Sequence, residues 1–187
     1  MSRWADQKIS IAFVKMLRTR SMDDITVIEV CEKAGVNRQS FYYHFKDMGE
    51  LLEFIIRNKL EKFIPKDNIY GKWPNQLEKV LAYSKKYRDI ILNIYKSSYQ
   101  ARFIDIIKNY AEQLSKDGLD QYLAFKSINL NDEEKEFLVN IRGMAFVGIY
   151  QLFIEKGLTE DPVKVAEWCG KVFRGSMEFI IEKFKEQ

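Results

Sequence analysis

Residues 34–47 read AGVNRQSFYYHFKD and combine four aromatic residues with His44, the only histidine of the chain. Polar and basic residues border the aromatic run: Arg38, Gln39 and Ser40 before it and Lys46 after it. Such a stretch could form an active site, part of a hydrophobic core, or a surface that contacts another molecule. The segments around it decide between these three possibilities.

The residues just before this stretch carry the signals of a short helix and a tight turn. Thr26 and Glu29 have the T-x-x-E spacing of a capping box, which predicts a helix over residues 26–33. Gly35 follows at the position where a left-handed residue commonly ends a helix. Asn37 can then cap the next helix, because its side-chain oxygen can accept a hydrogen bond from an N–H of the first turn.

Two further helices complete the pattern, one over residues 38–44 and an earlier one over residues 4–20. Apolar residues recur every three or four positions in the 4–20 segment, which indicates one buried stripe. Three such helices can bury their stripes against each other. The short turn between the last two is typical of a helix-turn-helix, whose second helix enters the DNA major groove.

The helix over residues 38–44 carries residue types that can recognise DNA. Arginine offers two parallel donors to guanine, and glutamine can pair with adenine. The predicted base contacts are Arg38, Gln39 and Ser40, the predicted phosphate or thymine-methyl contacts are Tyr42 and Tyr43, and the predicted backbone contacts are His44 and Lys46. Phe41 and Phe45 lie four residues apart and share one face of the helix, which we assign to the core.

Catalysis and metal binding have little support in the sequence. Cys31 and Cys169 lie far apart, no CxxC pair exists, and a single histidine makes a zinc cluster implausible. A Ser-His-Asp or Cys-His site would have to use His44, whereas catalysis by carboxylates or lysine alone stays open. We therefore expect no metal, no cofactor and no enzymatic activity. An enzyme on a helical scaffold and a helical adaptor with a vestigial DNA module stay open as alternatives, which a salt-dependent DNA-binding assay would separate.

The excess positive charge of the chain lies in its first third. Residues 1–66 contain 12 Lys and Arg against 9 Asp and Glu, whereas residues 67–187 contain 18 of each. A basic end on a neutral body is typical of a module that binds a polyanion. No apolar run approaches a membrane span, and the start lacks the apolar block of a signal peptide, so we expect a cytoplasmic protein without a membrane partner.

The fold class is predicted to be all-α, because no period-2 alternation occurs and the three prolines fall at expected helix ends. Beyond residue 46, the predicted helices span residues 48–64, 74–85, 87–96, 99–115, 119–125, 131–156 and 162–184. Residues 65–74 are expected to connect two parts of the protein. We place an N-terminal three-helix DNA-binding domain at residues 1–46 and a larger C-terminal helical domain at residues 47–187, with helix 48–64 linking the two.

ITVIEVCEKAGVNRQSFYYHFKD, residues 25–47, resembles the DNA-binding domain of the TetR family of bacterial regulators, and the likeness spans about residues 8–56. The NRQSFYYHF variant and the segment 146–168 are similar to a subgroup that includes DhaS-like regulators. The resemblance implies that Thr26 contacts a DNA phosphate. Met48 departs from the family pattern, which usually has a phosphate-binding lysine there, so binding is weaker or Lys46 replaces the contact.

The resemblance also implies that the larger domain encloses an effector pocket and mediates dimerisation. The aromatic residues that could line such a pocket are Tyr83, Tyr87, Tyr99, Phe103 and Tyr150. The last two long helices offer small and apolar residues for a four-helix dimer contact, and the candidates are Phe146, Ile149, Phe153, Phe173, Met177 and Ile180.

These features predict an effector-responsive repressor that binds a palindromic double-stranded DNA operator as a homodimer. A small-molecule effector of unknown identity would favour a different spacing of the recognition helices by tilting helix 48–64. The alternative is a transcriptional activator, or a co-regulator controlled by a protein partner.

Overall fold

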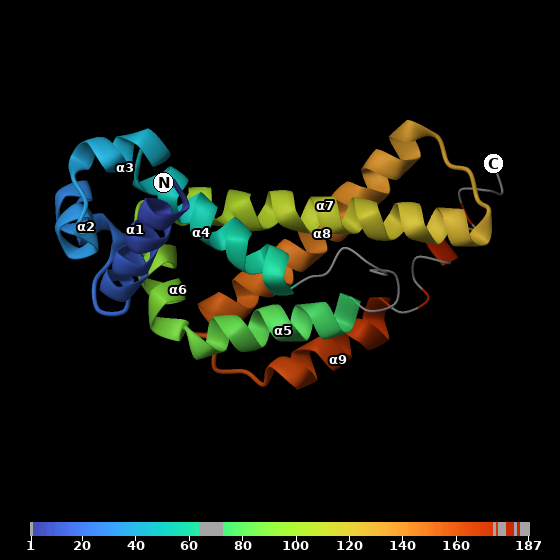
Figure 1. Cartoon of the computed structure of the whole chain (residues 1–187). Coiled ribbons are helices and arrows are strands. Elements are labelled where there is room, and N and C mark those ends of the chain that lie inside the picture. Colours follow the sequence, from blue (N-terminus) through green and yellow to red (C-terminus); the bar gives the residue numbers. More distant parts are fainter. Residues whose placement is uncertain (1, 64–72, 174, 176–178, 182, 184–187) are drawn as a thin grey trace. The chain divides into compact units, whose positions relative to one another are not determined.

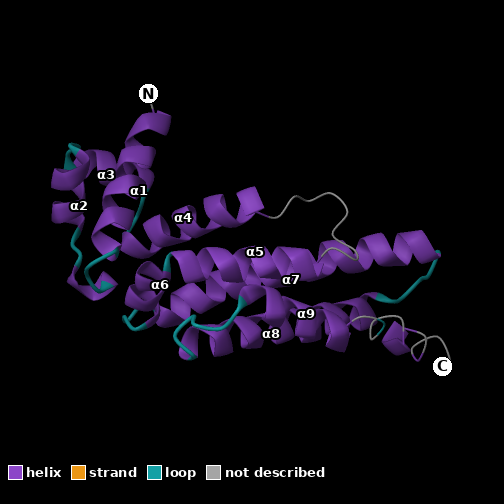
Figure 2. Ribbon diagram, turned by 90° about the horizontal axis from the view of Figure 1, so that it is seen from below, coloured by secondary structure: helices purple, strands orange, loops and turns teal. Residues whose placement is uncertain are grey.

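The computed structural model describes residues 2–63, 73–173, 175, 179–181 and 183, and every regular element among them is helical (Figures 1 and 2). The elements are α1 (Ser2–Leu17), the 3₁₀ turn η1 (Met22–Asp24), α2 (Val27–Ala34), α3 (Arg38–His44), α4 (Met48–Phe63), α5 (Trp73–Lys86), α6 (Arg88–Tyr95), α7 (Gln100–Lys126), α8 (Asp132–Glu155) and α9 (Pro162–Phe173). The predicted all-α fold class is confirmed.

The chain packs into two compact units. The first combines residues 1–61 with residues 87–106, and the second combines residues 62–86 with residues 107–187. Helix α7 therefore begins in the first unit and ends in the second. The predicted division at residue 46 concerns function rather than packing and stays a prediction; packing adds α6 and the start of α7 to the N-terminal helices.

The helix-turn-helix of the first unit forms through the local signals that the sequence predicts. The Thr26 hydroxyl accepts the Glu29 N–H at 3.3 Å, and the Glu29 carboxylate accepts the Thr26 N–H at 2.9 Å, which closes the capping box at the start of α2. Gly35 ends α2 with φ 67° and ψ 39°, a left-handed conformation that glycine adopts without steric cost. The Asn37 side chain accepts the Ser40 N–H at 2.7 Å and caps α3.

Helix α1 supplies the apolar face on which α2, α3 and α6 pack. The side chains that fill this core are fully or almost fully buried: Ile9, Phe13, Leu17, Met22, Val30, Phe41, Phe45, Leu51 and Leu52. Most of them recur at helical spacing, so the periodicity in the sequence and the burial in the structure agree.

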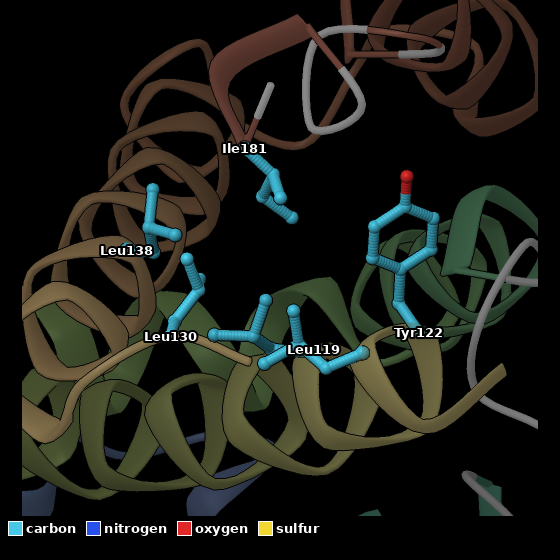
Figure 3. Packing of buried hydrophobic residues seen from close by; sticks show 6 residues of the cluster. Leu119, Tyr122, Leu130, Leu138 and Ile181 are labelled. Atoms are coloured by element: carbon cyan, nitrogen blue, oxygen red, sulfur yellow. The ribbon is translucent and has the colours of Figure 1, made fainter. Parts of the chain in front are cut away.

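The second unit has its own core. Helices α5 and α9 lie side by side (Figures 1 and 2). The Trp73 ring links them to α8, because it meets Phe146 edge-on at 5.3 Å between ring centroids and Phe173 at 5.8 Å. A separate cluster joins the end of α7 to the start of α8 and to residues near the C-terminus (Figure 3), and its buried members are Leu119, Tyr122, Leu123, Leu130, Leu138 and Ile181.

The predicted break between helices 99–115 and 119–125 is wrong, because α7 runs without interruption from Gln100 to Lys126. Gly118 lies within the predicted break, and glycine in a helix interior costs about 1 kcal/mol relative to alanine. Packing outweighs this local cost, because Leu119, Tyr122 and Leu123 directly after Gly118 are buried. The predicted connection at residues 65–74 lies mostly outside the described residues.

The last predicted helix, 162–184, corresponds in the described residues to α9, Pro162–Phe173, and to helical residues 179–181. Helix α8 corrects the expectation that no run approaches a membrane span. Among the described residues it is the one helix long and apolar enough to cross a bilayer by length and composition, with an 18-residue window of mean hydropathy 1.6. A core helix of a soluble protein passes the same test of length and composition.

Candidate nucleic-acid interface

Two phenylalanine side chains pack α3 against the hydrophobic core of the first unit. Phe41 and Phe45 are buried, with ring centroids 5.7 Å apart, and Phe45 meets Phe54 of α4 edge-on at 5.3 Å. Their predicted assignment to the core is confirmed. A row of three rings therefore packs α3 against α4, while other side chains of α3 stay exposed.

The outward face of α3 carries the predicted DNA-binding side chains. Arg38 and Gln39 are exposed, and Tyr42 and Tyr43, one turn further along, are 51% and 79% exposed. Residues four apart on a helix lie above one another, so Arg38 lies beside Tyr42 and Gln39 beside Tyr43. A tyrosine that is four-fifths exposed contributes little to folding, so this face is suited to a partner molecule.

Three further predicted contacts lie around this face with differing exposure. Ser40 is half-buried, and its N–H is already used by the Asn37 cap. His44 is half-buried between neighbouring rings, with its centroid 5.1 Å from that of Tyr43. Lys46 is exposed, and its backbone N–H donates to the Glu50 carboxylate at 2.5 Å. Ser40 and His44 therefore expose a smaller fraction of their surface than Lys46 does, and less of it is accessible to DNA.

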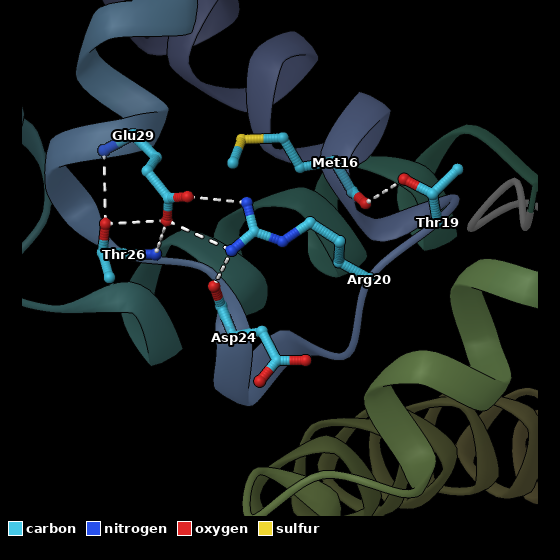
Figure 4. A network of polar contacts seen from close by, with 6 residues as sticks. All are labelled: Met16, Thr19, Arg20, Asp24, Thr26 and Glu29. Atoms are coloured by element: carbon cyan, nitrogen blue, oxygen red, sulfur yellow. Dashed lines mark hydrogen bonds and ion pairs between the residues drawn. The ribbon is translucent and has the colours of Figure 1, made fainter.

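Thr26 lies at the start of α2 in a polar network (Figure 4). Its hydroxyl donates to the Glu29 carboxylate at 2.8 Å, and Arg20 binds the same carboxylate at 2.7 Å. The arginine also donates to the Asp24 carbonyl oxygen. The Arg20 guanidinium first, and the hydrogen bonds from Thr26 next, lower the pKa of Glu29 to about 2.

This network defines how a phosphate could approach α2. The Thr26 hydroxyl donates to the Glu29 carboxylate, and the Glu29 N–H donates back to the Thr26 hydroxyl, so both donors are already used within the capping box. An anion at the start of α2 would bind the remaining N–H groups of the first turn. Sequence reasoning missed Arg20, because its partner Glu29 is nine residues away. The predicted phosphate contact of Thr26 remains a prediction.

Met48 is 7% exposed and forms part of the core at the start of α4. Because its side chain is buried, Met48 contributes to folding and offers no surface to a phosphate. The Asp47 carboxylate caps α4 by accepting the Glu50 N–H at 2.8 Å. That hydrogen bond is the main cause of a lowered Asp47 pKa, and Arg102 lowers it further.

The two cysteines are free thiols. Burial raises the pKa of both Cys31 and Cys169, which disfavours the reactive thiolate. Within the part of the chain that the structure describes, no three His, Cys, Asp or Glu side chains gather closely enough to hold a metal ion.

The five predicted effector-pocket residues divide between the two units: Tyr87, Tyr99 and Phe103 belong to the first, and Tyr83 and Tyr150 to the second. Phe103 and Tyr150 are buried, and the other three are half-buried. An open groove of about 680 Å³ in the second unit is lined by other residues: Pro74, Asn75, Glu78, Val163, Ala166, Glu167, Gly170 and Lys171. The pocket assignment therefore stays a prediction.

The predicted dimer residues differ in how much surface they offer. Phe153 is 1% exposed, so its own protomer already buries it. Phe146, Ile149, Phe173 and Ile180 are half-buried, and Met177 lies outside the described residues. The strongly exposed apolar side chains of α8 are others: Phe137, Ile141, Met144 and Leu152.

Comparison with known proteins supports the structural picture. The sequence model described as "Bacterial regulatory proteins, tetR family" matches residues 12–55, and that described as "Transcriptional regulator C-terminal region" matches residues 71–175. The HTH-type dhaKLM operon transcriptional activator DhaS of Lactococcus lactis subsp. lactis (strain IL1403) is 31% identical over 75 residues. That alignment spans 40% of this chain and 40% of the relative.

One of the solved structures that resemble this chain shares its fold, at lower sequence identity. The structure titled "Dihydroxyacetone kinase operon activator DhaS" is 20% identical, with a TM-score of 0.71 over 94% of this chain and 97% of that chain. A tetR-family transcriptional regulator from Streptomyces coelicolor is 15% identical, with a TM-score of 0.48 over 87% of this chain and 76% of that chain, which is too low to define a shared fold. The C-terminal sequence model matches more than half of the chain and the N-terminal one covers the helix-turn-helix, so the chain belongs to the TetR family of DNA-binding bacterial transcriptional regulators, which are not enzymes.

Proposed function

We propose that the protein is a cytoplasmic, effector-responsive regulator that binds a palindromic operator as a homodimer. The single observation that carries the DNA contact is the surface of α3, where Arg38, Gln39, Tyr42 and Tyr43 are exposed while Phe41 and Phe45 are buried. These side chains are long and lie on a short, capped helix, the geometry with which a recognition helix enters the major groove.

Each side chain has a distinct role in this proposal. Arg38 and Gln39, in the first turn of α3, contact base edges, since their paired donors and acceptors match guanine and adenine. Tyr42 and Tyr43 contact phosphates or thymine methyl groups, and Lys46 contacts the backbone. Ser40 and His44 make secondary contacts because they are half-buried.

The dimer contact rests on the composition of α8. One side of this helix is buried in its own unit through residues such as Leu138 and Phe153. The other side exposes an apolar stripe, Phe137, Ile141, Met144 and Leu152, interrupted at Gly148, where an added Cβ would meet no atom within 4 Å. A second copy would cover this stripe, with the half-buried Phe146, Ile149, Phe173 and Ile180 at its border. Two-fold symmetry then pairs two α3 helices with two half-sites.

The effector response rests on the second unit. Its interior holds the polar pair Ser84 and Tyr150 among apolar side chains, and Tyr83 lies on the same helix as Ser84. A small ligand that binds one spacing of the α3 helices more tightly than another shifts the equilibrium by that difference in affinity. The other predicted pocket residues, Tyr87, Tyr99 and Phe103, belong to the first unit, and this proposal places no site between the two units.

The protein could repress or activate transcription, and both directions of regulation are candidates. Repression is the simplest, because an operator-bound dimer blocks a promoter. Activation is the second, and it is favoured by the likeness to a relative named as a dhaKLM operon transcriptional activator and to a structure titled "Dihydroxyacetone kinase operon activator DhaS". A reporter gene placed behind the selected operator distinguishes them, since deletion of the regulator raises expression in the first case and lowers it in the second.

The test of the DNA-binding proposal begins with selection of duplexes from a random library by the purified full-length protein. We expect an inverted repeat whose half-sites lie about 34 Å or a multiple of it apart, protected in a footprint on one face of the DNA. Binding should weaken steeply with salt, because phosphate contacts release counterions. Recovery of unrelated sequences by a folded protein would refute the operator proposal.

A further inference from the structure

Two carboxylates bracket the helix-turn-helix, and the start of α7 holds both of them. Asp23 lies in η1 just before α2, and Asp47 lies just after α3. Ser98, in the turn before α7, binds the first, and Arg102, in the first turns of α7, binds the second. All four residues belong to the first unit.

The contact before α2 is a tight one. The Asp23 carboxylate accepts the Ser98 backbone N–H at 3.0 and 3.1 Å and the Ser98 hydroxyl at 2.6 Å. The same carboxylate lies at the positive end of α7, where a negative charge is favourable. Asp23 therefore joins the residues before α2 to the turn that precedes α7.

The contact after α3 depends on a missing side chain. An added Cβ at Gly49 would lie 2.3 Å from Nη1 and 2.6 Å from Cζ of Arg102, so the guanidinium lies directly on the glycine backbone. From there Nη1 reaches the Asp47 carboxylate at 3.2 Å, and Nη2 lies 3.9 Å from the Glu53 carboxylate. Arg57 also pairs with Glu53, at 2.8 Å, but lies on α4 itself.

We propose that Ser98 and Arg102 are positioning residues for DNA recognition: they form a brace through which α7 fixes the ends of the α2–α3 pair. Ser98 lies two residues before α7 and Arg102 lies in its first turn, so the two contacts flank the start of this helix. A further contact supports the brace, because the Asn93 side chain donates to the Leu17 carbonyl oxygen at the end of α1 at 2.9 Å. The brace acts through Asp23 and Asp47 and itself touches no DNA.

The brace rests on the DNA-binding function of the family and deepens the proposed effector response. Helix α7 continues to Lys126 within the second unit, so the element that holds the helix-turn-helix also belongs to the region proposed to sense the effector. In this proposal α7, as one continuous helix from Gln100 to Lys126, contributes to the effector response together with α4.

The experiment compares Ser98→Ala, Arg102→Gln and their combination with Arg57→Gln as the matched control. Arg57→Gln removes an arginine from the same carboxylate network without touching α7. The probes are the duplex selected by the parent protein and a random-sequence duplex of equal length. We expect the combined variant to bind the selected duplex about tenfold more weakly. Its salt dependence should match that of the parent, because no phosphate contact is lost.

Hydrogen exchange of the DNA-free proteins provides the second measurement. Amides of α2 and α3 should exchange faster in the combined variant than in Arg57→Gln, while those of α8 stay unchanged. If the parent selects no sequence, the operator proposal fails, and the exchange data still decide on the brace. Gly49→Ala should reproduce the effect by displacing the guanidinium; Arg102→Gln alone serves if the combined variant does not fold.

Three outcomes would overturn the brace. One is parental affinity and exchange in the combined variant. Another is a loss of affinity with a smaller salt slope, which would make Arg102 a direct phosphate contact. The third is faster exchange throughout both units, which would reduce Ser98 and Arg102 to general stabilising residues.

Discussion

The hydroxyl groups of Ser84 and Tyr150 lie 2.9 Å apart in the interior of the second unit, 66 residues apart in sequence. Both side chains are buried, and burial raises the pKa of Tyr150 to about 12. Tyr150→Phe should lower the free energy of unfolding by about 1–3 kcal/mol, because it leaves a buried serine hydroxyl without this partner. Urea unfolding measures the change.

The double variant Ser84→Ala/Tyr150→Phe is the control for that prediction. It removes both polar groups, so its loss of stability should be smaller than the sum of the two single losses. Additive losses would show that the hydrogen bond contributes nothing and that each substitution acts through packing alone.

Glu29 gives a pH-dependent prediction. Its pKa falls from 4.5 to about 2 in the folded protein, chiefly through Arg20 and then Thr26, so folding favours the ionised form. The stabilisation is present above about pH 4.5 and is lost as the pH falls towards 2. The difference in thermal stability between the parent and Glu29→Gln should therefore be constant near neutral pH and shrink in acid. A difference that is equal at pH 3 and pH 7 would contradict this account.

Arg38 and Tyr42 should both matter for operator binding. Arg38→Ala should cost about 1–3 kcal/mol of binding free energy and relax the preference at one base pair, because one bidentate base contact is lost. Tyr42→Ala should weaken selected and random duplexes alike if its hydroxyl contacts a phosphate. Competition assays against single-base variants of the operator separate the two effects.

Folding should survive both substitutions, because Arg38 is exposed and the Tyr42 ring is half-exposed. Phe41→Ala is the contrasting variant, since this side chain is fully buried and its loss should destabilise the domain by about 3–5 kcal/mol. Parental affinity in the Arg38→Ala/Tyr42→Ala combination would remove α3 from the proposed interface.

A charge placed on the exposed stripe of α8 should prevent dimerisation. Met144 is 63% exposed, so Met144→Asp should leave the fold of one protomer intact while burying an unpaired charge in a dimer. Analytical ultracentrifugation should then show a shift from dimer to monomer, together with weaker operator binding. Lys135→Asp, on the same helix but outside the stripe, is the matched control.

Local signals explain why the helix-turn-helix could be predicted to within a residue. Thr26, Gly35 and Asn37 act on neighbours within a few positions, and each makes the contact that its type and spacing indicate. The burial of Phe41 and Phe45 followed from their spacing of four, and it also fixed which side of α3 faces outward.

Long-range contacts could not be predicted in the same way. Asp23 and Ser98 are 75 residues apart, and no periodicity links them. Phe153 illustrates a second limit: helix α8 is apolar on two sides, so the sequence alone does not show which of its apolar side chains pack inside the protomer and which stay exposed. Gly118 illustrates a third, because its unfavourable helix propensity is smaller than the packing of the residues that follow.

The continuity of α7 has a geometric consequence. Its 27 residues extend over roughly 40 Å, and each residue turns the helix by about 100°. The helix geometry therefore sets the rotation about the helix axis from Arg102 to Lys126 as well as the distance between them. One alanine inserted near the middle of α7 would rotate one end of the helix relative to the other by about 100° and lengthen the helix by only about 1.5 Å. Seven inserted alanines would nearly restore the original rotation.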